Sequence, residues 1–267
     1  MILCGIFLGA IYLPEYFIAI KKNEGEVLST LDSYIPLLPP KDKFYADPFL
    51  FEYEDRNYIF FEDYDYHKGV ISYVSIDENR EMTVPKVALE LPTHLSFPCV
   101  FQEEEKIYMV PETYDYRSVS LFKAVRFPDQ WQHVRTLIRG EKFSDSILFK
   151  HNEYYWLFTS VKKDRLRIYY AKDLNSTFYP HPINRRHIRG RNAGYVYFKN
   201  GHLIRPVMDC RIRYGRSMIL KEIVLLDLEH FIEKEIAYIE PNWTPYLTRT
   251  HTYSQNEEYV VYDGSYR

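Results

Sequence analysis

The feature that most constrains the fold is a segment of the chain that returns at intervals of about 50 residues. Two hydrophobic segments around a charged turn occur first as Ala46–Phe51 with Tyr58–Glu62, and then as Ser96–Phe101 with Tyr108–Glu112. The offset is 50 residues at both ends, from Pro48 to Pro98 and from Glu62 to Glu112. Self-similarity at a fixed period indicates a repeat architecture, in which each unit buries its apolar face against the next unit.

Three further copies follow along the chain. They are Ser144–Phe149 with Tyr155–Thr159, Ala193–Phe198 with His202–Pro206, and His251–Tyr253 with Tyr259–Gly264. Each of the first four units continues into another strand, at Gly69–Ile76, Ser118–Val125, Leu166–Ala171 and Met218–Leu225. Short strands repeated in this way are typical of propeller blades. The sequence therefore predicts an all-β fold, a five-bladed β-propeller.

The fifth unit is too short to complete a blade, because only five residues remain after Tyr262. Residues 16–20 read as its missing strand, so we predict a ring closed by N- and C-terminal strands, without open sheet edges. We expect one domain over residues 1–267, with blades near 43–90, 91–140, 141–185, 190–240, and 248–267 plus 14–30. The apolar spacing over residues 223–236 leaves a single helix between the last two blades as an alternative.

The composition agrees with strands and excludes some partners. The chain has 26 Tyr, 17 Phe and 3 Trp, and aromatic residues suit a pleated, half-buried surface. A net charge of -3, without a long basic run, argues against a nucleic-acid partner. The densest basic stretch, from Arg185 to Arg191, predicts either a solvated loop or a site for an anionic ligand such as a phosphorylated sugar.

The cysteines and the N-terminal segment give weaker signals. Cys4, Cys99 and Cys210 are odd in number and widely spaced, so we expect no disulfide framework and no zinc site. We also expect no bound metal and no cofactor. The apolar segment Met1–Leu13 is short for a membrane span and lacks the basic start of a signal peptide. It reads as a strand or an irregular start. We expect no membrane span and a cytoplasmic protein.

The candidate site lies where the repeat brings ionisable residues to the centre of the ring. The innermost strand of each blade borders the central channel, and the first-strand positions are Asp47, Phe97, Asp145, Gly194 and His251. The ends of the second strands add Glu62, Glu112, Arg205 and Asp263. Ionisable groups that share a pocket are functional candidates, and this set predicts a pocket that holds a sugar.

Three of the carboxylates suit glycoside chemistry, which needs an acid and a second carboxylate as base or nucleophile. We assign Asp47 as base or nucleophile, Glu112 as acid, and Asp145 as the carboxylate that raises the pKa of the acid. The alternative is structural, because such residues also cap turns and strand ends.

Further side chains are predicted to bind the substrate. They are Glu62, His94, Phe97, Arg191, Arg205, Asp209, His251 and Asp263. Among the aromatic residues, Phe97, Tyr114 and Tyr195 are candidates for stacking on sugar faces. His251 is also a candidate for holding a central cation or a water molecule.

Several short motifs, in the same order along the chain, resemble the N-terminal domain of plant glucosamine inositolphosphorylceramide transferases. They are residues 46–49, 94–98, 108–113, 127–131, 144–145, 181–182, 191–194 and 205–206. Related stretches occur in bacterial polysaccharide-biosynthesis proteins. The resemblance covers roughly Phe17 to Gly264. That domain is in turn similar to the five-bladed propellers of arabinanases, β-xylosidases, invertases and levansucrases.

The resemblance implies roles for the same carboxylates. In the similar enzymes an aspartate that opens the first blade is the base or nucleophile, which matches Asp47, and an aspartate that opens a later blade matches Asp145. Glu112 is the nearest counterpart of the acid, although those enzymes carry it in a later blade, where this chain has Arg205. In the plant proteins the transferase chemistry belongs to another domain.

The sequence thus predicts a carbohydrate-active propeller of the glycoside hydrolase or glycosyl-transfer type, in polysaccharide or glycolipid metabolism. Its ligand is a sugar or glycan, neutral or anionic. The alternative is a non-catalytic module that binds a glycan and assists a partner glycosyltransferase. A third interpretation is a propeller used only for protein contacts.

Overall fold

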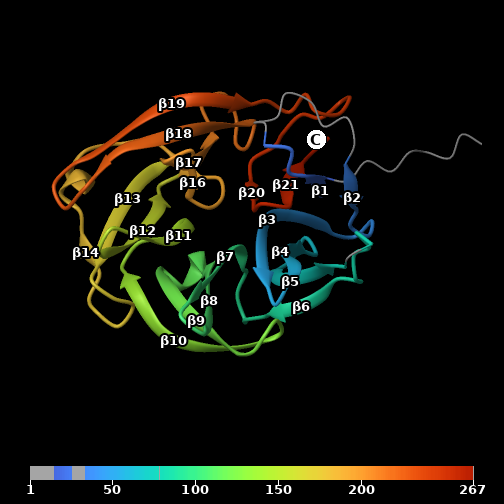
Figure 1. Ribbon diagram of the computed structural model, residues 1–267, viewed down its shortest axis with the longest axis horizontal. Coiled ribbons are helices and arrows are strands. Elements are labelled where there is room, and N and C mark those ends of the chain that lie inside the picture. Colours follow the sequence, from blue (N-terminus) through green and yellow to red (C-terminus); the bar gives the residue numbers. More distant parts are fainter. Residues whose placement is uncertain (1–14, 26–33, 78, 267) are drawn as a thin grey trace, which may run out of the picture.

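The strands of the protein form five antiparallel sheets arranged around one axis (Figure 1). The computed structural model describes residues 15–25, 34–77 and 79–266. Two short 3₁₀ helices, η1 (Tyr114–Tyr116) and η2 (Pro182–Arg185), interrupt the strands. The predicted all-β, five-bladed β-propeller is confirmed. Cys4 and the segment Met1–Leu13 lie outside the described residues.

Four blades are continuous in sequence. Blade 1 consists of β3 (Phe44–Tyr53), β4 (Arg56–Tyr64), β5 (Gly69–Ile76) and β6 (Lys86–Leu89). Blade 2 consists of β7 (Ser96–Glu103), β8 (Lys106–Glu112), β9 (Ser118–Arg126) and β10 (Gln130–Arg139). Blade 3 consists of β11 (Ser144–His151), β12 (Tyr154–Val161), β13 (Arg165–Ala171) and β14 (Tyr179–Pro180). Blade 4 consists of β15 (Arg191–Asn192), β16 (Tyr197–Lys199), β17 (His202–Asp209), β18 (Ser217–Leu226) and β19 (Phe231–Ile239).

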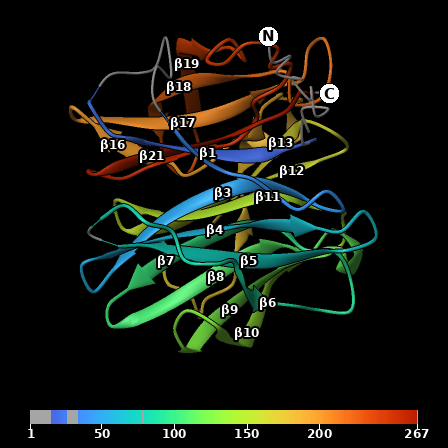
Figure 2. The same ribbon diagram turned by 90° about the vertical axis from the view of Figure 1, so that its right-hand side faces the viewer.

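Blade 5 is assembled from both ends of the sequence. Its strands, in sheet order, are β20 (Tyr253–Gln255), β21 (Tyr259–Gly264), β1 (Phe17–Lys22) and β2 (Ile35–Leu37). β1 pairs antiparallel with β21, with Phe17 opposite Gly264 and Lys22 opposite Tyr259. Figure 2 shows β1 in blue beside β21 in red. The ring is therefore closed by N- and C-terminal strands, as predicted.

Residues 223–236, for which the sequence also allowed a single helix, lie in the β-hairpin of β18 and β19. β18 and β19 pair from Leu226 opposite Phe231 to Met218 opposite Ile239. A register shift between Ile223 and Leu225 breaks the alternation of buried and exposed residues, so the apolar spacing no longer has a period of two. The turn contains neither Gly nor Pro, and the Asp227 carboxylate orders it by accepting the backbone N–H of Glu229 and of His230.

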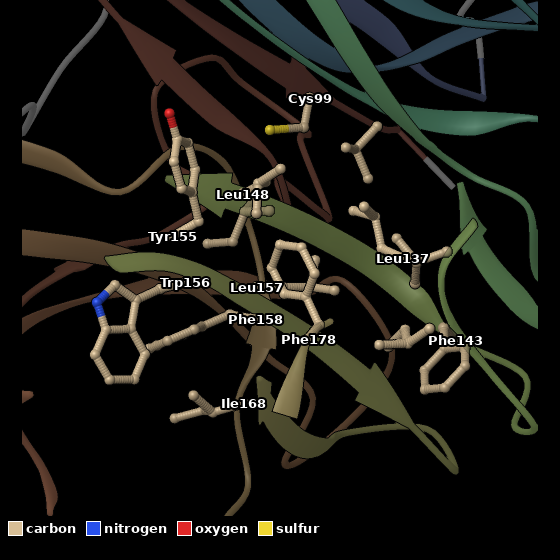
Figure 3. Close-up of a cluster of buried hydrophobic side chains, with 14 of the residues drawn as sticks. Cys99, Leu137, Phe143, Leu148, Tyr155, Trp156, Leu157, Phe158, Ile168 and Phe178 are labelled. Atoms are coloured by element: carbon tan, nitrogen blue, oxygen red, sulfur yellow. The ribbon is translucent and has the colours of Figure 1, made fainter. Parts of the chain in front are cut away.

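The hydrophobic core runs between the blades around the ring. One cluster joins blades 2, 3 and 4 and contains the fully buried Trp156 and Phe158, and Figure 3 shows its part around β11 and β12. Separate clusters join blades 1 and 2, blades 4 and 5, and blades 5 and 1. Burial of each such side chain contributes about 1.5–3 kcal/mol. The aromatic residues that dominate the composition therefore serve mainly to hold blade against blade.

The inner strands of blades 1 to 3 begin in the same unusual way. Asp47, Phe97 and Asp145 have positive φ angles of 52°, 47° and 48°. The register of each blade's first strand pair shifts at these positions, for example between Ala46 and Phe49. Such bulges re-aim a side chain at the rim of a sheet, and strained φ angles of this kind cluster at functional sites. We call the end of the ring that carries these bulges the site face.

Candidate functional site

Asp47 lies in a hydrogen-bonded group that joins blades 1 and 5. Its Oδ1 accepts a hydrogen bond of 2.7 Å from Thr252 Oγ1, and its backbone N–H donates to Asp263 Oδ2 over 3.3 Å. The Asp47 side chain is buried. Burial raises the pKa of Asp47 to about 7. The positive charge of His251 opposes this rise, and the negative charges of Glu62, Asp145 and Asp263 add to it.

His251 and Asp263 form a buried ion pair beside Asp47. His251 Nδ1 contacts Asp263 Oδ2, and Asp263 Oδ1 accepts the backbone N–H of His251 and of Thr252 at 2.8 and 3.0 Å. The His251 ring stacks on Tyr16, with ring centroids 4.8 Å apart. Burial lowers the pKa of His251, but Asp263 and the other carboxylates outweigh it and raise the pKa to about 9. A fixed positive charge therefore stands beside Asp47 at neutral pH.

Asp47, His251 and Asp263 are, among the described residues, the three side chains placed to hold a metal ion together. One ligand atom from each of Asp47, His251 and Asp263 lies within 4.8 Å of the others. A metal needs the neutral lone pair of a histidine nitrogen and deprotonated carboxylates. His251 Nδ1 instead faces Asp263 as an ion pair, so this arrangement holds a proton more readily than a cation.

A second group joins blades 2, 3 and 4 around Asp145. The backbone N–H of Asp145 donates to Glu112 Oε2 over 2.8 Å. Arg191 donates through Nε and Nη2 to the two carboxylate oxygens of Asp145, and its Nη2 lies 3.9 Å from Glu112 Oε2. Burial and the charge of Asp145 raise the pKa of Glu112 well above its usual value, and Arg191 offsets part of that rise. The protonated form of Glu112 is therefore favoured over that of an exposed glutamate.

Glu62 is paired with His94, which comes from the connection between blades 1 and 2. His94 Nε2 lies 3.2 Å from Glu62 Oε1, while Nδ1 accepts the backbone N–H of Gly69 over 2.9 Å. The proton of a neutral His94 is therefore on Nε2 and points to Glu62. Glycine is required at residue 69, because a Cβ there would lie 2.5 Å from the Leu95 carbonyl oxygen and 2.7 Å from the His94 ring.

The group around Asp145 and the pair of Glu62 and His94 adjoin an open depression on the site face, which we call the axial depression. Its volume is about 520 Å³, and its lining residues are His94, Glu112, Tyr114, Asp115, Ser144, Lys163 and Arg191. Tyr114 is exposed, with Lys142 Nζ 4.5 Å from its ring centroid. An exposed ring beside charged and hydroxyl groups suits the apolar face and the hydroxyls of a sugar.

The predicted carboxylates thus take different positions. Glu112 lines the axial depression, and Asp145 lies directly behind two lining residues because it binds Arg191 and follows Ser144. Asp47 belongs instead to the group of His251, Thr252 and Asp263. No ion pair joins the two groups in the described parts of the chain, and their charges act on each other through space.

Two aromatic candidates belong to the core rather than to a ligand surface. Phe97 is fully buried and meets the Phe49 ring edge-on at 4.8 Å. Tyr195 also packs edge-on against Phe49, and its hydroxyl donates to the Val100 carbonyl oxygen. Both rings fill space between blades, so of the three predicted stacking residues it is Tyr114 that faces the axial depression.

Arg205 also lies away from any ligand surface. It is fully buried, and its Nε and Nη2 donate to Glu233 Oε2 at 3.0 and 2.7 Å. Its Nη1 donates to the Gly190 carbonyl oxygen and to Asn192 Oδ1. Asn192 in turn donates to the Asp145 carbonyl oxygen over 2.6 Å, so Arg205 supports the backbone of the site instead of contacting a sugar.

The remaining predicted polar residues are engaged elsewhere. The carboxylate of Asp209 accepts three hydrogen bonds from Arg211, which lower its pKa. In the basic stretch, Arg185, Arg186, His187 and Arg189 are exposed, whereas Arg191 turns toward Asp145. The stretch is thus a solvated loop for most of its length, and one member reaches the site.

Sequence reasoning missed several residues of the site. Thr252 directly follows a predicted first-strand residue, so its position in the repeat was a usable signal. Tyr16 stacks on the His251 ring and belongs to the segment predicted as the missing strand of the fifth unit, whereas Tyr214 meets the same ring edge-on from the connection between β17 and β18. Lys163 lies in the tight turn between β12 and β13, where a lysine carries no signal of a site.

The fold defines a class, the five-bladed propellers, and solved glycoside hydrolases share this fold. A family 117 glycoside hydrolase from Zobellia galactanivorans matches with a TM-score of 0.60 and 13% identity, over 94% of this chain and 91% of that one. The catalytic domain of the GH62 alpha-L-arabinofuranosidase of Coprinopsis cinerea matches with a TM-score of 0.60 and 11% identity, over 83% and 90%. At these identities the likeness shows a shared fold.

The sequence places the chain more narrowly. Residues 38–243 match the family described as glucosamine inositolphosphorylceramide transferase 1, N-terminal, and the chain belongs to that family. The glucosamine inositolphosphorylceramide transferase 1 of Arabidopsis thaliana is 31% identical over 210 residues, which are 73% of this chain. The match spans 27% of the Arabidopsis protein, so the chain corresponds to about a quarter of that relative. None of the described segments forms a helix long and apolar enough to cross a membrane.

Proposed function

We propose that this protein binds a sugar in the axial depression and acts on it as a carbohydrate-active propeller of the glycoside hydrolase or glycosyl-transfer type. The observation that carries this proposal is the pair of buried carboxyls, Asp47 and Glu112, whose pKa values are both raised at the centre of the ring. Perturbed carboxyls beside a depression are the groups that glycoside chemistry uses. The names of the relative and of the structural neighbours support a carbohydrate ligand.

The proposed roles follow from the protonation states. The raised pKa of Glu112 favours its protonated form, and from that form Glu112 donates a proton to the leaving oxygen of the glycosidic bond. Asp47 is partly ionised near pH 7, and the cationic His251 favours that ionised form, so Asp47 acts as base or nucleophile. Asp145 maintains the raised pKa of Glu112 by repulsion between like charges. This assignment parallels glycosidases, in which two carboxyls in different environments divide the two roles.

The second candidate is a non-catalytic module that holds a glycan for a partner glycosyltransferase. Arg191 favours it, because a guanidinium that binds Asp145 and lies 3.9 Å from Glu112 stabilises ionised carboxylates and opposes proton donation. In this alternative Arg191 and Lys163 bind an anionic group on the glycan, and the carboxylates orient its hydroxyls. A role in polysaccharide or glycolipid metabolism in the cytoplasm is part of both candidates.

Glycan-array binding followed by product analysis of each hit separates the two candidates. The catalytic proposal expects turnover by the wild type and loss of at least about 100-fold in rate for Glu112→Gln and for Asp47→Asn, in line with the usual contribution of a general acid or base. Glu153→Gln, a change on an exposed turn, is the matched control and keeps full activity. Binding without products supports the module, and full activity of both site variants overturns the assigned roles.

A further inference from the structure

A second cavity lies on the outer part of blade 2, and we call it the blade-2 groove. It has a volume of about 540 Å³, within the range of about 300–1,000 Å³ that is usual for ligand sites. Its lining residues are Leu91, Thr113, Tyr116, Arg117, Ser118, Ser120, Phe122, His133, Thr136, Arg139 and Gly140. The proposed catalytic residues do not contribute to it.

The groove exists because blade 1 covers blade 2 incompletely. The outermost strand of blade 1, β6, spans just Lys86–Leu89, whereas β10 in blade 2 spans Gln130–Arg139. Cross-strand pairs on one face of β9 and β10 therefore remain open beside Leu91. These pairs are Ser118 with Arg139, Ser120 with Thr136, and Phe122 with His133.

The floor of the groove carries hydroxyl groups where an inter-blade face normally carries apolar side chains. Ser118 and Ser120 are each 8% exposed, and the structure gives neither side-chain hydroxyl a protein partner among the described residues. Neither Oγ is among the described side-chain atoms that are buried without a hydrogen-bond partner, so both hydroxyls face the space of the groove and can bond to water or to a ligand. A ligand with hydroxyl groups of its own would replace that water.

Two arginines at the rim give the groove a positive charge. Arg117 Nη2 donates to the Gly140 carbonyl oxygen over 2.7 Å, and Arg139 Nη2 donates to Thr136 Oγ1 over 3.2 Å. In the described part of the chain neither guanidinium has a carboxylate partner, and no carboxylate lines the groove. Each guanidinium keeps further N–H donors for an anion. The exposed ring of Tyr116 stands at the same rim.

The groove and the axial depression share one wall, the segment from Glu112 to Arg117. Glu112, Tyr114 and Asp115 line the axial depression, whereas Thr113, Tyr116 and Arg117 line the groove. The short helix η1 therefore separates two cavities with a single turn. A ligand that extends beyond one sugar unit in the axial depression reaches the groove by crossing this turn.

We propose that the blade-2 groove is a second subsite, which binds an anionic sugar unit of the same ligand. Ser118, Ser120 and Thr136 bind its hydroxyls, Tyr116 contacts its apolar face, and Arg117 and Arg139 bind its phosphate or carboxylate group. This inference deepens the proposed function, on which it rests for the identity of the ligand as a carbohydrate.

Binding of three small probes to the intact protein tests the proposal. Glucose 6-phosphate, glucuronate and glucose are titrated while the NMR signals of the His133 imidazole, which lines the groove, are recorded. We expect saturable shifts with one or both anionic probes and at least about tenfold weaker binding of glucose, since hydrogen bonds to charged groups are the stronger ones. A phosphate preference and a carboxylate preference identify the two sources of the anion.

Variants locate the binding and separate this proposal from the catalytic one. Arg139→Gln, at an exposed position, weakens the anionic probes about tenfold, and Ser120→Leu fills the groove and removes binding. Arg126→Gln on the same strand pair, outside the groove, is the matched control and leaves Kd unchanged. The readout is binding at His133 and not turnover, so a failure of the catalytic proposal leaves this result intact. Equal binding of glucose, insensitivity to Arg139→Gln, or no saturable shift with any probe overturns the proposal.

Discussion

At the scale of single residues, Asp47 couples the candidate site to the stability of the fold. Its pKa is about 7 in the native protein, against 3.8 for an ordinary aspartate, so the native state binds this proton more tightly than the unfolded chain does. The stabilisation is fully present below about pH 4 and is lost as the pH rises through about 7. The site therefore costs the protein stability at neutral and alkaline pH.

Asp47→Asn is expected to remove this dependence. The neutral variant should be more stable than the wild type at pH 8 by more than about 1 kcal/mol, since one pKa unit corresponds to about 1.4 kcal/mol, and the difference should vanish near pH 4. Urea denaturation at the two pH values measures it. Asp209→Asn is the contrasting control. Arg211 lowers the pKa of the Asp209 carboxyl, so removal of that carboxylate should destabilise the protein at pH 8. Equal stability of Asp47→Asn and the wild type at pH 8 would contradict the raised pKa.

The pKa of Asp47 also predicts how turnover depends on pH. Because the base form of Asp47 is needed, kcat/KM should rise as the pH increases through about 7, and it should fall at higher pH when Glu112 loses its proton. The hydrogen bond from Thr252 to Asp47 Oδ1 favours the ionised form of Asp47. Thr252→Val removes this bond, so the limb of the profile that rises near pH 7 should move to higher pH. A pH profile of wild type and variant checks this, and an unmoved lower limb would argue that another group controls it.

At the scale of elements, Arg205 in β17 stabilises the fold, although its position in the repeat predicted that it binds a ligand. The fully buried Arg205 guanidinium lies with Lys221 around the carboxylate of Glu233, whose side chain is 9% exposed, and it also supports Asn192. Removal of one partner from a buried ion pair is strongly destabilising, because it leaves charge behind without compensation.

Arg205→Met is therefore expected to reduce the free energy of unfolding by about 3 kcal/mol, with little change in the affinity of the axial depression for a glycan hit. Arg205→Lys keeps the charge but not the forked geometry, so its free energy of unfolding should lie between those of the wild type and Arg205→Met. Urea denaturation and glycan titration measure the two effects. Should affinity fall while stability stays unchanged, Arg205 would be a binding residue, as its place in the repeat first indicated.

The repeat made the strands and the closure of the ring predictable, because apolar segments and turns recur in fixed order. It could not predict the hairpin of β18 and β19 unambiguously, since the bulge near Leu225 hides the period of two. The repeat made the places of Asp47, Asp145 and Glu112 in their strands predictable, because it fixes equivalent positions in successive blades. The pairing of Arg191 with Asp145 depends on how two blades pack, and sequence spacing does not reveal such a contact.

At the scale of the whole molecule, the ring is held closed by the contact of blade 5 with its neighbours. Ile18 in β1 is fully buried in a cluster with Leu50 and Ile59 of blade 1 and Val261 of β21. This cluster joins segments from opposite ends of the sequence, so it is the apolar part of the closure.

Ile18→Ala is expected to cost about 2–5 kcal/mol, the usual range for truncating a buried isoleucine to alanine. Ile35→Ala in β2 of the same blade is the control and should have little effect, because Ile35 is exposed. Hydrogen exchange should show that the amides of β21 lose protection before those of blade 3. Uniform loss of protection in all blades would mean that the ring opens as one unit and not at blade 5.

The pairing of β1 with β21 also sets an order in time during synthesis. A ribosome makes β1 before blade 1 and makes β21 after all four continuous blades, so β1 waits for its partner until nearly the whole described chain has emerged. Domains otherwise begin to fold from the N-terminal side as they are made, and pairing between distant segments is slow. Until β21 is made, the nascent chain therefore holds an arc of blades with two unprotected ends, and the pairing of β21 with β1 turns that arc into a ring.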